Sequence, residues 1–298
     1  MTNSRRSVAV IGLGILGTPM AVNLIKAGYD VIGYNRSVAK AQALVERGGR
    51  AASTIAEAVG AADVILTVLP DSPDVEEVAE GRGGLFDSAQ PGALWIDSST
   101  IRPDVSQRLA VAARARGIRA IDAPVSGGEV GAIEGTLSIM VGGEAADFDA
   151  AKPILEAVGS TIVHVGPAGA GQTVKAANQL LVAGIIELVA EALVFIDAHG
   201  VDTDAAIRVL SGGLAGNRIL ERKASSMVAR VYEPGFRVDL HHKDLGILTT
   251  AAREAGVAIP LGALTAQLMG TLRAQGYGGL DHSALHLLVE TLSGRRPA

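Results

Sequence analysis

The stretch VAVIGLGILG, residues 8–17, decides how this chain folds. Its first four residues are apolar and mostly β-branched, which predicts a short buried strand. The spacing G-x-G-x-x-G follows at once, in a loop formed by Gly12, Leu13, Gly14, Ile15, Leu16 and Gly17, and a helical pattern opens at its end. Between a strand and a helix, such glycines permit a tight turn and let the backbone approach a pyrophosphate. This context favours a dinucleotide site over a purely structural glycine turn.

Alternating strand and helix patterns extend from this loop to about residue 165. Strands are predicted at the apolar runs DVIGYN, DVILTVL, ALWIDSS, IRAIDAP, LSIMVGG and TIVHV, and helices at residues 38–47, 103–116 and 145–158. This alternation is typical of parallel βαβ units. Residues 1–165 are therefore predicted to form an α/β domain of the Rossmann type, with a doubly wound sheet that binds NAD(P).

Only helical patterns follow the stretch PAGAG at residues 167–171. Residues 172–199 are apolar on nearly every side, which predicts a long buried helix between the two domains. Shorter helices are expected at residues 204–210, 220–231, 243–255, 262–275 and 282–292. We therefore predict an all-α domain at residues 166–298 and no membrane-spanning segment.

The composition narrows the range of partners. The chain has 298 residues, enough for two domains, and its 48% hydrophobic and 19% charged residues suggest large buried surfaces between subunits or domains. A formal net charge of -5 and only 3% aromatic residues disfavour nucleic acid as a partner. The absence of cysteine excludes disulfides, thiolate metal sites and cysteine nucleophiles. An oligomeric cytoplasmic protein is expected.

The end of the second predicted strand bears on the choice of coenzyme. An acidic residue about 20 positions beyond the glycines would accept a hydrogen bond from the ribose 2′-hydroxyl of NAD. This chain has Asn35, Arg36 and Ser37 there. A guanidinium and a hydroxyl suit a 2′-phosphate better than a bare ribose, so the local chemistry favours NADP(H), with NAD(H) as the alternative. In that alternative, Arg36 is a solvated residue that stacks on the adenine.

A second glycine-rich stretch, DAPVSGG at residues 122–128, joins a predicted strand to a loop. Loops at the carboxyl ends of parallel strands are where such sheets bind ligands. Ser126 offers a hydroxyl, while Gly127 and Gly128 let backbone N–H groups converge on an anion such as a carboxylate. The stretch is interpreted as a substrate loop, although its spacing alone does not reject a connection without a ligand.

Three polar residues share one face near the start of the long apolar helix. Lys175, Asn178 and Gln179 are spaced i, i+3 and i+4. A lysine in an apolar cleft is costly unless it meets an anionic substrate or transfers protons. A structural salt bridge, or a side chain that extends to the surface, explains the lysine equally well. The adjacent His241 and His242 diverge on a helix and lack an acidic cluster, so no metal is expected.

Four ordered motifs resemble those of the β-hydroxyacid dehydrogenase family over nearly the whole chain: GLGILGTPMAVNLIKAGYDVIGYNRS, DAPVSGGEVGAIEGTLSIMVGG, GAGQTVKAANQ and KDLGI. The resemblance implies an NAD(P)-dependent oxidoreductase whose helical domain forms homodimers or homotetramers. It implies that Lys175 is the catalytic acid or base. Near the substrate it places Ser126, Gly127, Gly128, Asn178 and Gln179. Near the cofactor it places Leu69, Pro70, Thr100 and Lys243.

Three C-terminal stretches narrow the resemblance within the family. GGLAGNRIL, PGFRVDLHHKDL and DHSAL are most similar to the members that reduce tartronate semialdehyde to D-glycerate. One alternative is a 3-hydroxyisobutyrate dehydrogenase or another reductase of short semialdehydes from the same family. A second is a coenzyme-binding scaffold without activity, which the presence of Lys175 disfavours. The expected partner is a small aldehyde or hydroxy acid that bears a carboxylate. Asn35 departs from the aspartate typical of NAD-using members and leaves the coenzyme choice open.

Overall fold

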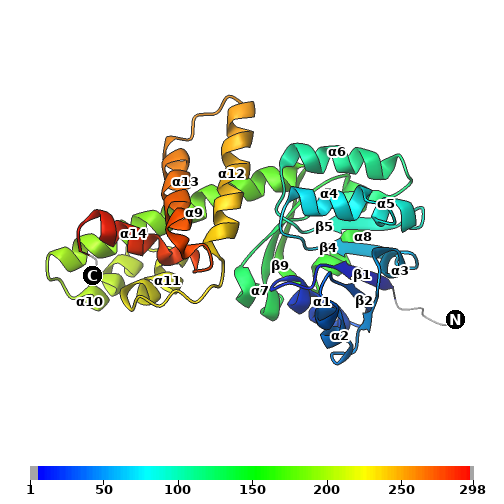
Figure 1. The fold of residues 1–298 in the computed structure, drawn as a ribbon, viewed down its shortest axis with the longest axis horizontal. Coiled ribbons are helices and arrows are strands. Elements are labelled where there is room, and N and C mark those ends of the chain that lie inside the picture. Colours follow the sequence, from blue (N-terminus) through cyan, green and yellow to red (C-terminus); the bar gives the residue numbers. More distant parts are fainter. Residues whose placement is uncertain (1–5, 296–298) are drawn as a thin grey trace. The chain divides into compact units, whose positions relative to one another are not determined.

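The computed structural model describes residues 6–295 and divides into two compact units, Met1–Lys175 and Ala176–Ala298. All the strands lie in the first unit, and the second contains helices (Figure 1). The predicted fold class, a Rossmann-type sheet followed by an all-α part with a long helix, is confirmed.

The sheet of the first unit has the strand order β3-β2-β1-β4-β5-β6-β8-β7, with β9 paired to β8. Its strands are β1 (Ser7–Ile11), β2 (Asp30–Tyr34), β3 (Arg50–Ala51), β4 (Val64–Thr67), β5 (Leu94–Asp97), β6 (Arg119–Asp122), β7 (Val125–Ser126), β8 (Leu137–Gly142) and β9 (Gly159–Gly166). β1 to β6 are parallel. Between β1 and β4 the strand order reverses, which is where doubly wound sheets bind ligands.

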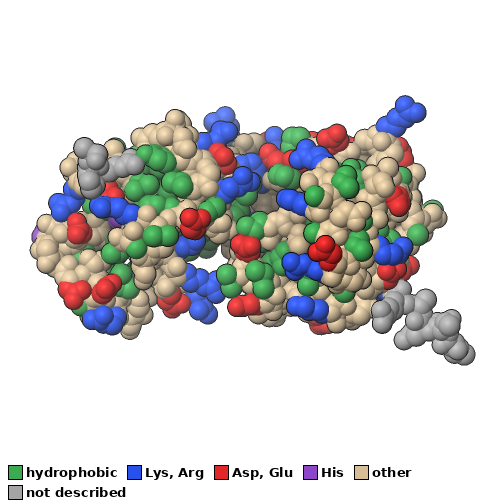
Figure 2. Space-filling model, turned by 60° about the horizontal axis from the view of Figure 1, so that its bottom comes forward, with side chains coloured by type: hydrophobic (Ala, Val, Ile, Leu, Met, Phe, Trp, Pro, Cys, Tyr) green, Lys and Arg blue, Asp and Glu red, His purple; other side chains and the backbone are tan. Residues whose placement is uncertain are grey.

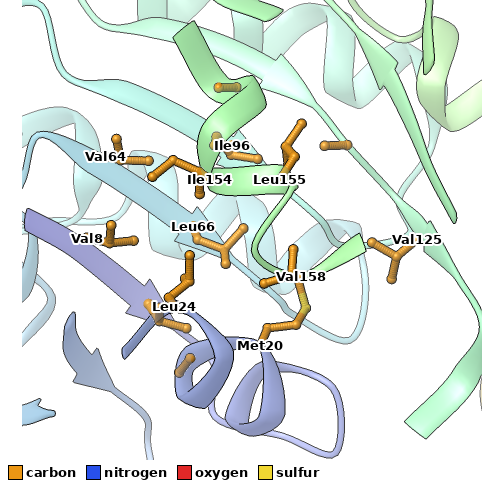
Figure 3. Packing of buried hydrophobic residues seen from close by; sticks show 14 of the residues in the cluster. Val8, Met20, Leu24, Val64, Leu66, Ile96, Val125, Ile154, Leu155 and Val158 are labelled. Atoms are coloured by element: carbon orange, nitrogen blue, oxygen red, sulfur yellow. The ribbon is translucent and has the colours of Figure 1, made fainter. Parts of the chain in front are cut away.

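Helices cover both faces of this sheet (Figure 1). They are α1 (Gly17–Lys26), α2 (Val38–Val45), α3 (Ile55–Val59), α4 (Ser72–Glu80), α5 (Leu85–Ser88), α6 (Pro103–Arg114), α7 (Gly128–Glu134) and α8 (Ala145–Leu155). Because successive strand residues point to opposite faces, Val8 and Val10 of β1 pack with α1, α2, α7 and α8, whereas Ala9 and Ile11 pack with α3 to α6. Figure 3 shows the first of these two cores, with Leu24 of α1 near Val8.

The sheet departs from the parallel βαβ pattern at β8. β8 runs antiparallel to β6 and β7, and only its pairing with β9 is parallel. The chain between β7 and β8 is too short for a parallel crossover, which needs about a dozen residues or more. The stretch expected to be an open loop also holds α7, bounded by Gly127 and Gly135 with φ of 139° and 68°.

The second unit is built on α9 (Ala170–Ala198), which starts at the end of the first unit. The other helices are α10 (Thr203–Gly212), α11 (Arg218–Val228), α12 (Val238–Glu254), α13 (Pro260–Leu272) and α14 (Leu285–Leu292), with the short turns η1 (Arg273–Tyr277) and η2 (His282–Ala284). By length and composition α9 is able to cross a membrane, since its most apolar 18 residues have a mean hydropathy of 2.1. A core helix has the same properties, and Ala183, Ile186 and Leu193 of α9 lie in the core of this unit.

Charged side chains of both signs are interspersed on the face of the molecule shown in Figure 2, with hydrophobic side chains between them. On this face no single sign of charge dominates an extended area.

Candidate active site

The residues expected to bind the coenzyme in the first unit gather at the carboxyl ends of four neighbouring strands. Gly12 follows β1, Asn35 follows β2, Leu69 and Pro70 lie just beyond β4, and Thr100 lies just beyond β5. These strands are adjacent in the order β2-β1-β4-β5. The fold therefore brings segments far apart in sequence to the switch point of the sheet.

Close backbone contacts shape the glycine loop. Gly12 has φ of 99°, a conformation that residues with a Cβ rarely adopt. A Cβ on Gly17 would collide with the Gly12 carbonyl oxygen, whereas a Cβ on Gly14 would meet no heavy atom within 4 Å. The loop thus closes tightly on itself, leaves open space at Gly14, and leads directly into α1. This geometry fits a pyrophosphate held at the start of a helix.

The turn after β2 shows what Asn35 and Arg36 contact. Asn35 Oδ1 accepts a hydrogen bond from the Leu13 backbone N–H at 3.0 Å, and Asn35 Nδ2 donates to the Ser37 carbonyl oxygen at 3.3 Å. Asn35 therefore ties the glycine loop to the end of β2. The Arg36 side chain is 80% exposed and lies 3.5 Å from an Asp74 carboxylate oxygen. Such an exposed ion pair is weak, so the guanidinium is free to reorient towards an anion.

Hydrogen bonds join the loops after β4 and β5. The Leu69 N–H donates to Ser99 Oγ at 2.9 Å, and the Ser99 N–H donates to Asp97 Oδ1 at 3.1 Å. Thr100, which is half-buried, follows Ser99, while Pro70 is exposed. The two loops expected to meet the coenzyme are thus held together by Ser99.

The predicted substrate loop begins in β7. Ser126 is half-buried and pairs with Ser138 of β8. Gly127 and Gly128 are exposed and have φ of 139° and 67°, so both use backbone conformations that favour glycine. The Ser126 hydroxyl therefore lies beside two exposed glycines.

Lys175 is brought to this loop by α9. Its side chain is buried, with 6% exposed, and Nζ donates a hydrogen bond to the Val125 carbonyl oxygen at 2.8 Å. Val125 directly precedes Ser126. A buried lysine beside a loop that could bind a carboxylate is suited to exchange a proton with a substrate held there.

Two buried residues that the sequence did not single out hold the first turn of α9. Asp122 accepts hydrogen bonds from the backbone N–H groups of Gly169 and Gln172 at 2.7 and 2.8 Å. The Gln172 side chain accepts from the Ile101 N–H at 3.1 Å and donates to the Ser99 carbonyl oxygen at 2.8 Å. Burial raises the pKa of Asp122 to about 6, against the opposing effect of its backbone donors. Both residues lie within quoted motifs, but their partners are distant in sequence.

In the second unit a chain of polar contacts links the remaining predicted residues. Asn178 Nδ2 donates to Gln179 Oε1 at 2.8 Å, and Gln179 Nε2 donates to Asp244 Oδ2 at 2.6 Å. Lys243 Nζ lies 2.8 Å from Asp244 Oδ1. Gln179 and Asp244 are buried. Asp244, which the sequence did not indicate, thus connects a residue expected near the substrate with one expected near the cofactor.

His241 packs against a second histidine inside the helical unit. His241 is fully buried, and its Nδ1 lies 3.0 Å from His282 Nδ1. Its Nε2 lies 3.4 Å from the Gln179 carbonyl oxygen. Within residues 6–295, no three His, Cys, Asp or Glu side chains are grouped so that they could hold a metal ion.

Comparison with known proteins places this chain in a family. The family model for the NAD binding domain of 6-phosphogluconate dehydrogenase matches residues 7–166. The model described as NAD-binding of NADP-dependent 3-hydroxyisobutyrate dehydrogenase matches residues 169–289. The two matches cover both units of the chain.

Individual relatives agree with these models. 2-Hydroxy-3-oxopropionate reductase of Escherichia coli K12 is 41% identical over 289 residues, which cover 97% of this chain and 98% of the relative. NAD-dependent L-serine dehydrogenase of Pseudomonas aeruginosa is 37% identical over 297 residues, which cover 97% of this chain and 100% of the relative. The solved structure of 3-hydroxyisobutyrate dehydrogenase from Mycobacterium tuberculosis with L-serine has a TM-score of 0.87 and 33% identity, and the match covers 97% of this chain and 99% of that one.

The chain therefore belongs to the β-hydroxyacid dehydrogenase family of NAD(P)-dependent oxidoreductases. The resemblance of its four motifs is confirmed, and so is the prediction that it is an enzyme with a nicotinamide coenzyme.

Proposed function

We propose that the protein reduces tartronate semialdehyde (2-hydroxy-3-oxopropanoate) to D-glycerate. The observation that carries this proposal is the buried Lys175 ammonium, hydrogen-bonded at the Val125 carbonyl directly beside Ser126. The 41% identity to a relative named 2-hydroxy-3-oxopropionate reductase supports the choice of substrate. Because nicotinamide coenzymes are intracellular, we expect the enzyme to work in the cytoplasm.

The first unit is proposed to hold the coenzyme. The pyrophosphate would lie against the backbone at Gly12, Gly14 and Gly17, and Leu69, Pro70 and Thr100 would line the adjoining loops. When bound, the nicotinamide supplies the hydride for reduction. The helical unit is proposed to contribute Lys243 to the same coenzyme, with Asp244 as the partner that holds its ammonium at 2.8 Å.

Lys175 is proposed to act as the general acid. Its ammonium would hydrogen-bond the aldehyde oxygen of the substrate and donate a proton as that oxygen becomes an alkoxide. In the reverse direction the neutral amine would take the proton. The Ser126 hydroxyl and the peptide N–H groups of Gly127 and Gly128 would hold the substrate carboxylate, which fixes the reacting carbon.

Asn178 and Gln179 are proposed to complete the substrate site in different ways. Both ends of the Gln179 amide are hydrogen-bonded inside the protein, to Asn178 and to Asp244. Gln179 therefore orients Asn178. The half-buried Asn178 side chain is the better placed of the two to meet a substrate hydroxyl.

NADP(H) is the proposed coenzyme, with NAD(H) as the alternative. Asn35 carries no charge that would repel a 2′-phosphate, and the exposed Arg36 guanidinium stands beside it with Ser37. The relative that is an NAD-dependent enzyme supports the alternative.

We also propose that copies of the chain associate as homodimers or homotetramers through the helical unit. Four exposed apolar side chains recur on α9 at intervals of seven residues: Val174, Leu181, Leu188 and Phe195. Such a stripe suits packing against another helix. Light scattering of the purified protein should give a multiple of the 30.4 kDa chain mass, reduced by Leu188→Glu. A monomeric wild-type protein would contradict this part of the proposal.

Steady-state kinetics with a panel of substrates tests the proposed reaction. We expect the specificity constant for tartronate semialdehyde to exceed those for L-serine and 3-hydroxyisobutyrate by about tenfold or more, because small changes in a substrate that a pocket is shaped to bind cost about 1 to 3 kcal/mol. A higher specificity constant for L-serine or 3-hydroxyisobutyrate would show that the proposed substrate is wrong. The family assignment would still hold.

L-serine and 3-hydroxyisobutyrate are the second candidates. The 37% identity to an L-serine dehydrogenase and the solved structure of a relative with L-serine favour them. A coenzyme-binding scaffold without activity is disfavoured because Lys175 is retained and buried beside the substrate loop.

A further inference from the structure

The first turn of α9 is held by side chains from outside the helix. Asp122, at the end of β6, is 3% exposed and directs one carboxylate oxygen to the N–H of Gly169 and the other to the N–H of Gln172. The first N–H groups of a helix have no partner within it, and a capping side chain normally comes from the residue just before the helix. Here the cap is about 50 residues away in sequence, so it connects α9 to the sheet.

Gln172 makes the second connection. Its side chain is 1% exposed and bridges the carbonyl of Ser99 and the N–H of Ile101, the two residues on either side of Thr100. A single side chain thus ties α9 to the loop that is expected to contact the coenzyme. Replacement of either end of this amide would leave a buried backbone group without its partner.

Close packing leaves this turn little freedom to move. A Cβ on Gly142 would lie 2.5 Å from Asp122 Oδ1 and 2.8 Å from the Gly171 nitrogen. A Cβ on Gly171 would collide with the Met140 carbonyl oxygen. The backbone of α9 therefore lies directly on β6 and β8, at the point where Asp122 holds it.

Lys175 lies one turn beyond Gln172, and its ammonium contacts Val125, which is three residues after Asp122. The segment 122–125 thus holds α9 at two points, at its first turn through Asp122 and at the lysine through Val125. Because a helix is stiff over one turn, a shift of its start moves Lys175 by a comparable distance. A misplacement of about 1 Å in a reacting group costs up to roughly 100-fold in rate.

We propose that Asp122 and Gln172 are positioning residues for Lys175, which set its place relative to the coenzyme loop and the substrate loop. This inference rests on the proposed role of Lys175. Asp97 links the two residues. It lies opposite Asp122 in the β5–β6 register, and its carboxylate accepts a hydrogen bond from the Ser99 N–H. Asp97 and Asp122 both line a small cavity of about 10 Å³, which is close to the least space that can hold a water molecule.

A double-mutant cycle on the full-length protein tests the proposal. Asp122→Asn removes one of the two acceptors with little change in shape, and it should lower kcat roughly 10- to 100-fold while the dissociation constant for NADPH changes less than about threefold. In a Lys175→Ala background the same substitution should have almost no further effect on kcat, because no lysine remains for Asp122 to position. Gln172→Glu should lower kcat in the same background-dependent way.

The outcomes separate the two proposals. An equal loss of kcat from Asp122→Asn in both backgrounds means a general structural effect and overturns the positioning role. A Lys175→Ala enzyme with undiminished kcat overturns the proposed role of Lys175 as the general acid, on which the positioning role rests. Asp202→Asn, which alters the cap of α10 at the Ala205 N–H, serves as the matched control and should leave kcat unchanged. If Asp122→Asn does not fold, Gln172→Glu carries the same cycle.

Discussion

Replacement of Lys175 by alanine is expected to lower kcat by roughly 10² to 10⁴, the usual contribution of a general acid or base. The affinity for the coenzyme should stay nearly unchanged, because Nζ contacts the Val125 carbonyl beside the substrate loop and not the glycine loop. Single-turnover measurements with saturating coenzyme would isolate the chemical step from binding and product release.

The matched control for this variant is Lys152→Ala, which removes an exposed lysine from α8. It should retain wild-type kinetics. If Lys175→Ala kept the wild-type rate while the control did too, the proton would have to come from another group and the proposed mechanism would be wrong. If Lys175→Ala instead lost coenzyme affinity, the lysine would belong to the coenzyme site.

The second prediction with a large expected effect is the preference of the enzyme for one of the two nicotinamide coenzymes. NADPH is expected to be preferred over NADH by roughly tenfold or more, because a charge-assisted hydrogen bond from a guanidinium to a phosphate contributes about 1.5 to 3 kcal/mol. The Arg36 side chain is 80% exposed and its contact with Asp74 is 3.5 Å long, so the ion pair offers little resistance to binding a 2′-phosphate. Added salt should weaken the preference.

Two substitutions test this reading of the turn after β2. Arg36→Ala should raise KM for NADPH with little effect on NADH, whereas Arg47→Ala, which removes an exposed arginine just beyond α2, should change neither. Asn35→Asp keeps the acceptor for the Leu13 N–H and adds a charge that repels the phosphate, so it should move the preference towards NADH. A wild-type enzyme that uses NADH equally well would show that Arg36 does not read the 2′-phosphate.

The sequence predicts the parallel part of the sheet well because its strands are short apolar runs between strong turn signals. DVIGYN and ALWIDSS correspond to β2 and β5, and the 172–199 pattern corresponds to α9. It does not predict the direction of β8, because strand direction depends on which neighbour the chain reaches, and the apolar run LSIMVGG is the same in either orientation. The sequence does not predict α7 because this helix contains glycines, which normally oppose helix formation.

The residues of the candidate site also fall into those that a local motif predicts and those that only the fold brings together. The sequence predicts Gly12, Gly14 and Gly17 as coenzyme-binding residues, because the G-x-G-x-x-G motif reflects local backbone geometry. Asp122, Gln172 and Asp244 were not singled out, because each acts through a partner tens of residues away. Spacing alone leaves the role of Lys175 open, since periodicity places a lysine on a face but does not show its partner. Only the fold places its ammonium at Val125.

The most direct test of the central claim is product analysis of a single reaction. Purified protein is incubated with tartronate semialdehyde and NADPH, and D-glycerate is measured against the coenzyme oxidised. We expect one D-glycerate for each NADPH consumed by the wild-type protein, and almost none from Lys175→Ala over the same time. Oxidation of NADPH without D-glycerate, or equal yields from the two proteins, would contradict it.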